Sequence, residues 1–176
     1  MSIAKWVAMI ATGAMSGCAH AETEATTASA PAAACANSEH RQFDFWIGEW
    51  NVVFSATNEA AGHSVVESLY QGCTLRENWT GRGGYSGGSL NAYDPSDGKW
   101  KQTWVGSDGA VSFYTGRREG ESMVFLAQGV ENGAAHLLRM TFTPLADGAV
   151  RQHIERSNDG GVSWADEYDL RYIGVR

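Results

Sequence analysis

Glu77 and Arg139 are the two charged residues of this 176-residue chain with the most specific chemistry, provided that both enter the interior of the fold. Glu77 lies among apolar and aromatic residues, where a buried carboxylate needs a charge partner or takes up a proton. Paired with Arg139, it could act as a general base while the guanidinium orients an anionic or carbonyl substrate. A polar network that merely fills the interior would use the same pair, so both interpretations stand.

Eight side chains are expected to face a common interior. Aromatic, amide and charged side chains would there surround a small apolar or amphipathic molecule. Because successive side chains of a strand point to opposite faces, a register slip of one residue would reverse the assignment along that strand. The predicted ligand-binding residues are Glu77, Trp79, Asn91, Tyr93, Trp104, Arg139, Gln152 and Tyr168.

Ten runs rich in β-branched and aromatic residues must position these side chains, and no segment shows a sustained helical period. The connections are short, and several place Asp or Asn before Gly, which favours tight hairpin turns. Sequential hairpins predict an all-β fold, an antiparallel up-and-down β-barrel of about ten strands without free edges. The expected strands cover residues 50–56, 63–70, 73–80, 87–94, 99–106, 110–116, 122–128, 135–143, 149–157 and 164–175.

The aromatic stretch FDFWIGEW, residues 43–50, comes directly before the first expected strand. A helical turn over residues 38–45 is too short to persist alone, so we expect it to plug one end of the barrel. Gly48 would let the chain turn tightly from this plug into the first strand. A ligand would then enter from the opposite mouth. The residues assigned to the closure are Phe43, Phe45, Trp46, Gly48 and Trp50.

Two glycine-rich segments are interpreted as turns. Residues 157–164, SNDGGVSW, fit the surface turn called an Asp box, and a single copy predicts a well-formed hairpin. Residues 81–88, GRGGYSGG, break the GxGxxG spacing of a nucleotide-binding loop and lack a βαβ unit. We expect this second segment to form a flexible loop at the mouth of the barrel.

The Gly48-Glu49-Trp50 motif after a short plug resembles the start of the calycin barrels, which include lipocalins, fatty-acid-binding proteins and nitrobindin-like proteins. The resemblance implies that a late basic residue, Arg171 or Arg176, packs across Trp50. A nitrobindin-like barrel would bind haem through a late histidine such as His153, although its Arg-x-His-x-Glu surroundings equally fit a charged outer surface. No other cofactor is predicted, and no cluster has the spacing of a metal site.

A longer span, residues 43–172, resembles a bacterial family of exported proteins without an assigned function. The shared runs are FDFWIGEW, GCTLRENW, SLNAYDPSDGKWKQTWV and VRQHIERSNDGGVSW. This resemblance implies a fold more than an activity, because barrels of this kind carry many functions.

Residues 1–21 have the pattern of an export signal, with Lys5 before an apolar segment far shorter than the roughly 20 residues of a membrane-spanning helix. In one processing route Cys18 of a lipobox-like MSGC would be lipidated, and in the other cleavage would follow Ala21. Residues 22–37 would form a flexible tether and residues 38–176 the barrel domain. The sequence thus predicts a periplasmic protein or an outer-membrane lipoprotein of a bacterium, attached to the membrane only through an N-terminal lipid.

Cys35 and Cys73 remain after either processing route. Two cysteines in an exported protein predict a disulfide, which would pin the segment before the plug onto an early strand. Two separate thiols are the alternative.

The 13 basic and 20 acidic side chains give a net charge of −7, which argues against nucleic-acid binding through a basic surface.

Three functions fit the sequence. The favoured one is a lipocalin-like carrier or sensor of a small ligand in the cell envelope. The others are an isomerase, cyclase or hydrolase that uses Glu77 and Arg139, and a structural lipoprotein with a filled barrel.

Overall fold

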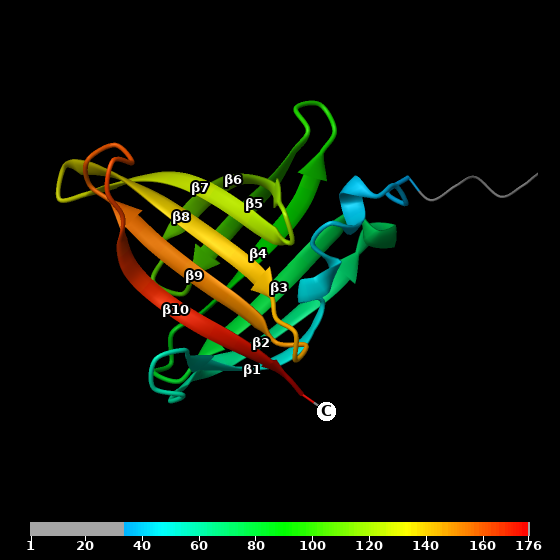
Figure 1. The fold of residues 1–176 in the computed structure, drawn as a ribbon, viewed down its shortest axis with the longest axis horizontal. Coiled ribbons are helices and arrows are strands. Elements are labelled where there is room, and N and C mark those ends of the chain that lie inside the picture. The colour runs from blue at the N-terminus through cyan, green and yellow to red at the C-terminus, as the bar shows by residue number, and fades with distance from the viewer. Residues whose placement is uncertain (1–33, 176) are drawn as a thin grey trace, which may run out of the picture. The chain divides into compact units, whose positions relative to one another are not determined.

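The computed structural model describes residues 34–175, which form ten antiparallel strands closed into a barrel (Figure 1). The order around the barrel is β1-β10-β9-β8-β7-β6-β5-β4-β3-β2. Each strand therefore pairs with its neighbours in sequence, and β10 closes on β1. The predicted all-β, up-and-down barrel is confirmed.

The strands agree with the ten predicted runs apart from shifts at their ends. For example, β7 continues three residues beyond the expected end at residue 128. Three short 3₁₀ helices accompany the strands: η1 (Glu39–Arg41), η2 (Asp44–Trp46) and η3 (Tyr70–Gly72). The strands are β1 (Gly48–Phe54), β2 (Ala60–Leu69), β3 (Thr74–Gly81), β4 (Ser86–Asp94), β5 (Lys99–Gly106), β6 (Val111–Glu119), β7 (Ser122–Glu131), β8 (Ala134–Pro144), β9 (Val150–Ser157) and β10 (Ala165–Gly174).

The helices η1 and η2, blue and cyan in Figure 1, close the end of the barrel at which β1 begins. Phe43 and Trp46 are completely buried there, and their rings stack with centroids 4.9 Å apart. Trp46 also packs on Phe142 of β8, 4.6 Å between centroids. We call this end the plugged half of the barrel. The aromatic stretch thus closes the barrel, as its position before the first strand predicts.

Gly48 joins the plug to β1 with a φ of +150°, in the region that favours glycine. A Cβ atom at this position would lie 3.3 Å from the Trp50 ring. The Trp50 indole N–H donates to the carbonyl oxygen of Trp46, 3.0 Å away, and so ties the first strand to the plug.

The expectation that Arg171 packs across Trp50 is wrong. Tyr172 packs there instead, with ring centroids 6.3 Å apart. Arg171 lies on the outer face of β10, where its guanidinium pairs with Asp147. Adjacent residues of a strand face opposite sides, so only one of the two can lie inside. The other candidate, Arg176, lies outside the described residues.

Cys35 and Cys73 form the predicted disulfide. The bond links the segment before η1 to the residue before β3, at the plugged end. Among the described residues, no helix is long and apolar enough to cross a membrane. The predicted signal, Cys18 and residues 22–33 of the tether lie outside the described residues.

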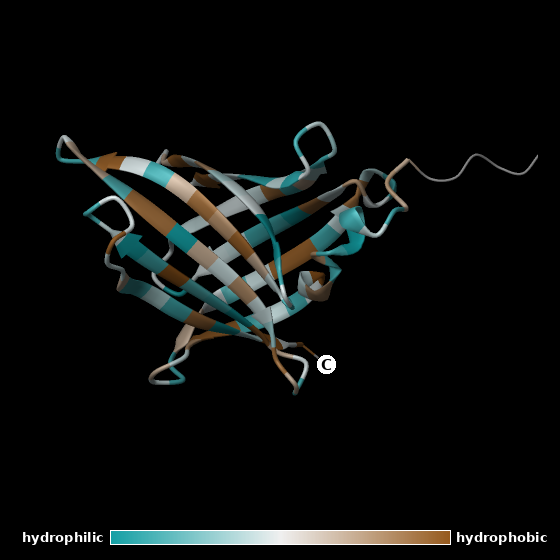
Figure 2. Cartoon of the chain, turned by 45° about the horizontal axis from the view of Figure 1, so that its top comes forward, coloured by the Kyte–Doolittle hydropathy of each residue, from teal (hydrophilic) through white to brown (hydrophobic). Residues whose placement is uncertain are grey.

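Hydrophilic and hydrophobic residues follow one another along the strands (Figure 2). On the inner face, several strands pass through three levels from the plugged end to the mouth. In β3 these levels are Leu75, Glu77 and Trp79, and in β5 they are Trp100, Gln102 and Trp104. An apolar floor, a polar middle and an aromatic upper wall therefore follow directly from the strand sequences.

Candidate functional site

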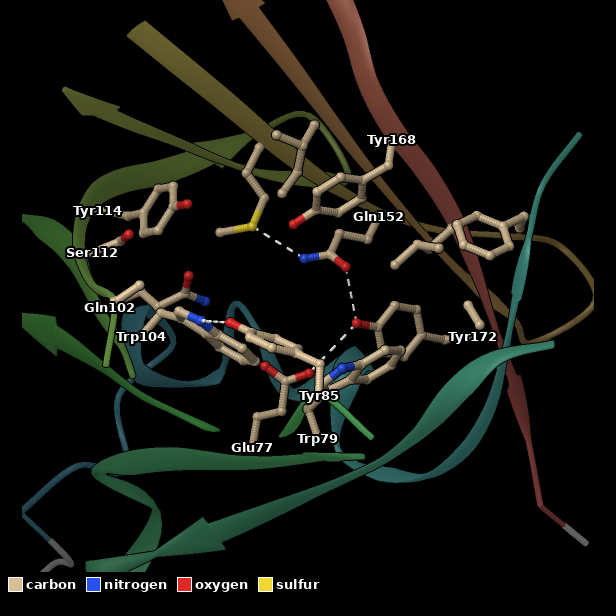
Figure 3. Close-up of a pocket in the computed structure, with 16 residues that line it drawn as sticks. Glu77, Trp79, Tyr85, Gln102, Trp104, Ser112, Tyr114, Gln152, Tyr168 and Tyr172 are labelled. Atoms are coloured by element: carbon tan, nitrogen blue, oxygen red, sulfur yellow. Dashed lines mark hydrogen bonds between the residues drawn. The ribbon is translucent and has the colours of Figure 1, made fainter. Parts of the chain in front are cut away.

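The half of the barrel away from the plug, which we call the open half, contains a cavity of about 420 Å³ (Figure 3). Its wall is mostly aromatic and aliphatic, with one carboxyl group and two side-chain amides. The lining residues are Phe54, Ala61, Glu77, Trp79, Tyr85, Gln102, Trp104, Ala110, Ser112, Tyr114, Met140, Gln152, Ile154, Tyr168, Leu170 and Tyr172.

Glu77 lies at the inner end of this cavity with 4 % of its surface exposed. One carboxylate oxygen accepts from the Ser64 hydroxyl at 3.0 Å, and the other from the Ser89 hydroxyl at 3.1 Å. The Tyr172 hydroxyl lies 3.4 Å from the first oxygen. No cationic side chain of the described residues forms an ion pair with Glu77.

Burial raises the pKa of Glu77 from its ordinary value to about 7, although the hydrogen bonds from Ser64, Ser89 and Tyr172 oppose this shift. The Tyr172 hydroxyl has one proton and two acceptors in reach, Glu77 and the side-chain oxygen of Gln152 at 2.9 Å. Because the pKa of Glu77 is about 7, both its acid and its carboxylate form are populated near neutral pH. Groups of this kind can exchange a proton with, or hold the charge of, a bound molecule.

A chain of amides orients the groups around Glu77. Gln102 donates to the side-chain oxygen of Asn91 at 2.7 Å, and Asn91 donates to the Ser89 hydroxyl at 2.9 Å. Ser89 can then direct its own proton only to Glu77. Gln102 lines the cavity with its amide nitrogen engaged, which leaves its side-chain oxygen as a second acceptor for a bound molecule.

The two cavity tryptophans lie against glycines of the neighbouring strands. A Cβ atom at Gly62 would lie 2.7 Å from the Trp79 ring, and one at Gly87 would lie 2.5 Å from the Trp104 ring. The missing side chains let the indoles lie close to the wall, which preserves the open volume. At the mouth, the Tyr85 hydroxyl accepts from the Trp104 indole N–H at 3.3 Å.

Five of the eight predicted ligand-binding residues line the cavity: Glu77, Trp79, Trp104, Gln152 and Tyr168. Asn91 is fully buried in the amide chain behind the lining. Tyr93 points inward but at the plugged end, where it packs on His40 and Trp100. It does not line the cavity because its strand, β4, reaches the plugged end near this residue.

The predicted pair of Glu77 and Arg139 is not formed. Arg139 lies on the outer face of β8, where two of its nitrogens each lie 2.7 Å from a carboxylate oxygen of Glu155. Its guanidinium also stacks 4.2 Å from the Trp164 ring centroid. Met140 and its alternating partners occupy the inner face of β8, so Arg139 must point outward.

The prediction omitted several residues of the site. Gln102 could have been found, because it alternates with Trp100 and Trp104 on one face of β5. Tyr172 follows Tyr168 by four residues of β10 and shares its face. Tyr85 lies in the glycine-rich segment that was expected at the mouth of the barrel, but nothing in the sequence indicated that its side chain reaches the cavity.

His153, the candidate haem ligand, lies on the outer face of β9, and its Nε2 atom is 2.8 Å from an Asp166 carboxylate oxygen. The described residues contain no cluster of His, Cys, Asp or Glu suited to a metal ion.

The 157–164 segment is a surface hairpin, in which Asp159 accepts from the backbone and hydroxyl of Ser163.

The geometry of the cavity is the main guide to its function. No protein-family model matches this chain. No curated protein matches it either. The resemblance to exported proteins therefore stays a prediction.

Proposed function

We propose that the protein binds a small apolar or amphipathic molecule in the open half of the barrel. The observation that carries this proposal is the cavity of about 420 Å³, with its aromatic wall and its few converging polar groups. Small-molecule sites in proteins are commonly concave, mostly apolar and about 300–1,000 Å³ in volume, with a small number of placed polar groups.

The cavity also argues against a barrel that is merely filled. Gly62 and Gly87 leave room for the indoles of Trp79 and Trp104 beside the wall, so these large side chains do not occupy the centre. The pattern at the N-terminus supports a place in the bacterial cell envelope, with Cys18 as the lipidated residue. We include export and tethering in the proposal on that ground.

A second candidate function is acid–base catalysis at Glu77. It is favoured by the position of this carboxyl in the cavity and by its pKa of about 7, which suits a group that must both accept and release a proton. Arg139 has no part in it, because its side chain lies on the outer face of β8. In such an enzyme, Glu77→Gln would abolish turnover while the protein still folds.

Binding can be tested with the protein purified from a bacterial host. Native mass spectrometry should show a co-purifying small molecule, and tryptophan fluorescence should change when neutral, cationic and anionic amphiphiles are titrated. Trp104→Phe should reduce the fluorescence response, whereas Trp164→Phe, at the outer surface, should preserve it. An unliganded protein that responds to no probe of any charge would overturn the proposal.

A further inference from the structure

We propose that the ligand carries an organic cation, an amine or quaternary ammonium group, which is held between the Glu77 carboxylate and the aromatic rings of the cavity. This inference rests on the proposed binding function and names the chemical class of its ligand.

The charge balance of the cavity favours a positive guest. Glu77 is the one acidic residue of the described lining, and that lining contains no Lys, Arg or His. The partners of Glu77 are neutral hydroxyl groups, which stabilise a carboxylate but leave its charge uncompensated. Burial of an unpaired charge is costly, and a cationic ligand would supply the missing partner.

The aromatic wall suits the same guest. Figure 3 shows Trp79, Trp104 and three tyrosines, Tyr114, Tyr168 and Tyr172, around the space that Glu77 faces. The face of an aromatic ring attracts a cation within about 6 Å, and aromatic cages are a recurrent way to bind quaternary ammonium groups. For a protonated amine, the side-chain oxygen of Gln102 would add an acceptor beside the carboxylate.

The turns around the mouth carry more negative than positive charge. Three of them contribute the acidic residues Glu59, Asp108 and Asp159, and a fourth contributes the basic residue Arg82. A negative rim raises the local concentration of cations and speeds their entry. The rim therefore acts in the same direction as the carboxylate below it.

The groups that face Glu77 determine how binding should depend on pH. They are Ser64 on β2, Ser89 on β4, Gln102 on β5, Tyr114 on β6, Gln152 on β9, and Tyr168 and Tyr172 on β10. Of these only the tyrosines titrate, and burial raises the pKa values of Tyr114 and Tyr172 above their ordinary value. Among Glu77 and the groups that face it, Glu77 is therefore the one that changes charge near neutral pH.

A permanent cation should bind more tightly as the pH rises, because it prefers the ionised form of Glu77. Below the Glu77 pKa of about 7, its affinity should fall by about tenfold for each pH unit, and above it should level off. A ligand with a carbonyl acceptor would show the opposite trend, since it prefers the protonated acid.

The experiment compares three probes with one tail: octyltrimethylammonium, 1-octanol and octanoate, each titrated by calorimetry at pH 5 to 9. We expect the cation to bind most tightly and octanoate least. Glu77→Gln should weaken the cation by about 30-fold or more, because it removes one partner of a buried charge pair, and should leave 1-octanol within about threefold. Glu121→Gln, an equal charge change at an exposed turn of the plugged end, is the matched control and should change neither affinity.

Binding of 1-octanol with no preference for the cation, or an affinity for the cation that does not rise with pH, would overturn this inference and leave the proposed function standing. Failure of all three probes to bind would count against the proposed function itself. The pH series uses the unaltered protein, so the test stands even where Glu77→Gln fails to fold.

Discussion

The two halves of the barrel are built from the same ten strands but are filled in different ways. In the plugged half, Phe43 and Trp46 from the N-terminal segment enter the barrel and are completely buried. In the open half no segment of residues 34–175 enters, and Trp79 and Trp104 lie close to glycines of the wall. The aromatic residues of one half therefore fill space, whereas those of the other half surround it.

The packing that stabilises the fold and the groups suited to binding lie in different halves of the barrel. Dense aromatic packing and the Cys35–Cys73 disulfide support the plugged half. The open half instead contains a buried carboxyl, Glu77, without a cationic partner among the described residues. Once it is ionised, such an unpaired group costs stability, which is the physical reason to assign it a role in binding.

The strongest test of the comparison is to remove one aromatic residue from each half. Trp46→Ala should lower the free energy of unfolding by about 4 kcal/mol, because it leaves a large void in a fully packed region. Trp104→Ala should cost about 1 kcal/mol, because its side chain is partly exposed and already borders empty space. Urea unfolding followed by circular dichroism measures both. Equal losses would show that the open half is packed as the plugged half is.

Removal of the disulfide should weaken the plugged half without changing the cavity. The double substitution Cys35→Ser, Cys73→Ser should lower the free energy of unfolding by about 3 kcal/mol, because the unfolded chain loses a covalent constraint. Ligand affinity should stay within about twofold wherever the variant is folded. The unaltered protein with a reducing agent is the control, and a loss of affinity in both would mean that the two halves are coupled.

The pH dependence of stability should report the buried carboxyl of the open half. Because folding raises the Glu77 pKa from its ordinary value of 4.5 to about 7, the folded state binds a proton more tightly than the unfolded state. Its contribution to stability is complete below pH 4.5 and is lost as the pH rises through 7. Between pH 5 and pH 8 the loss should be about 2 kcal/mol.

Thermal unfolding of the unaltered protein and of Glu77→Gln, measured across this pH range, isolates that contribution. The variant should lose much less stability than the unaltered protein. Parallel curves for the two proteins would mean that Glu77 is not the group that titrates.

The smallest effect is expected on the outer face. Arg139→Ala breaks a bonded pair with Glu155 and a contact with Trp164, but the guanidinium is about one-third exposed, so solvent weakens both interactions. The free energy of unfolding should fall by about 1 kcal/mol or less. Ligand affinity should not change. A loss of affinity as large as that of Glu77→Gln would restore the pairing of Arg139 with Glu77.

Local patterns account for most of what could be predicted. Hairpin turns such as Asn132-Gly133, where both residues have positive φ, are specified by residue type and separate the strands at the expected places. Alternation within β3 places Glu77 and Trp79 on one face, and that face proved to be the inner one. The disulfide followed from the two cysteines, Cys35 and Cys73, that remain after either processing route.

The errors occurred where a face had to be chosen. Arg139 was expected inside the barrel and Arg171 was a candidate to pack across Trp50, yet each is next to an inward-facing residue of apolar or aromatic character, Met140 and Tyr172. The apolar alternation of β8 already favours Met140 and Phe142 as the inner set. For Tyr93 the face was right but the level was wrong, because strand alternation does not show which end of the barrel a residue approaches.

The class of fold, the number of strands and the identity of the plug were predictable from residue types and spacing, since turn residues, strand alternation and the aromatic run before the first strand are local features of the chain. The tertiary structure alone decided the site. Glu77 meets Ser64, Ser89 and Tyr172 from three other strands, and Tyr172 lies 95 residues away in the chain. Closure of β10 on β1 and the register of every intervening strand pair bring these groups together. No local sequence pattern specifies this combination of closure and register.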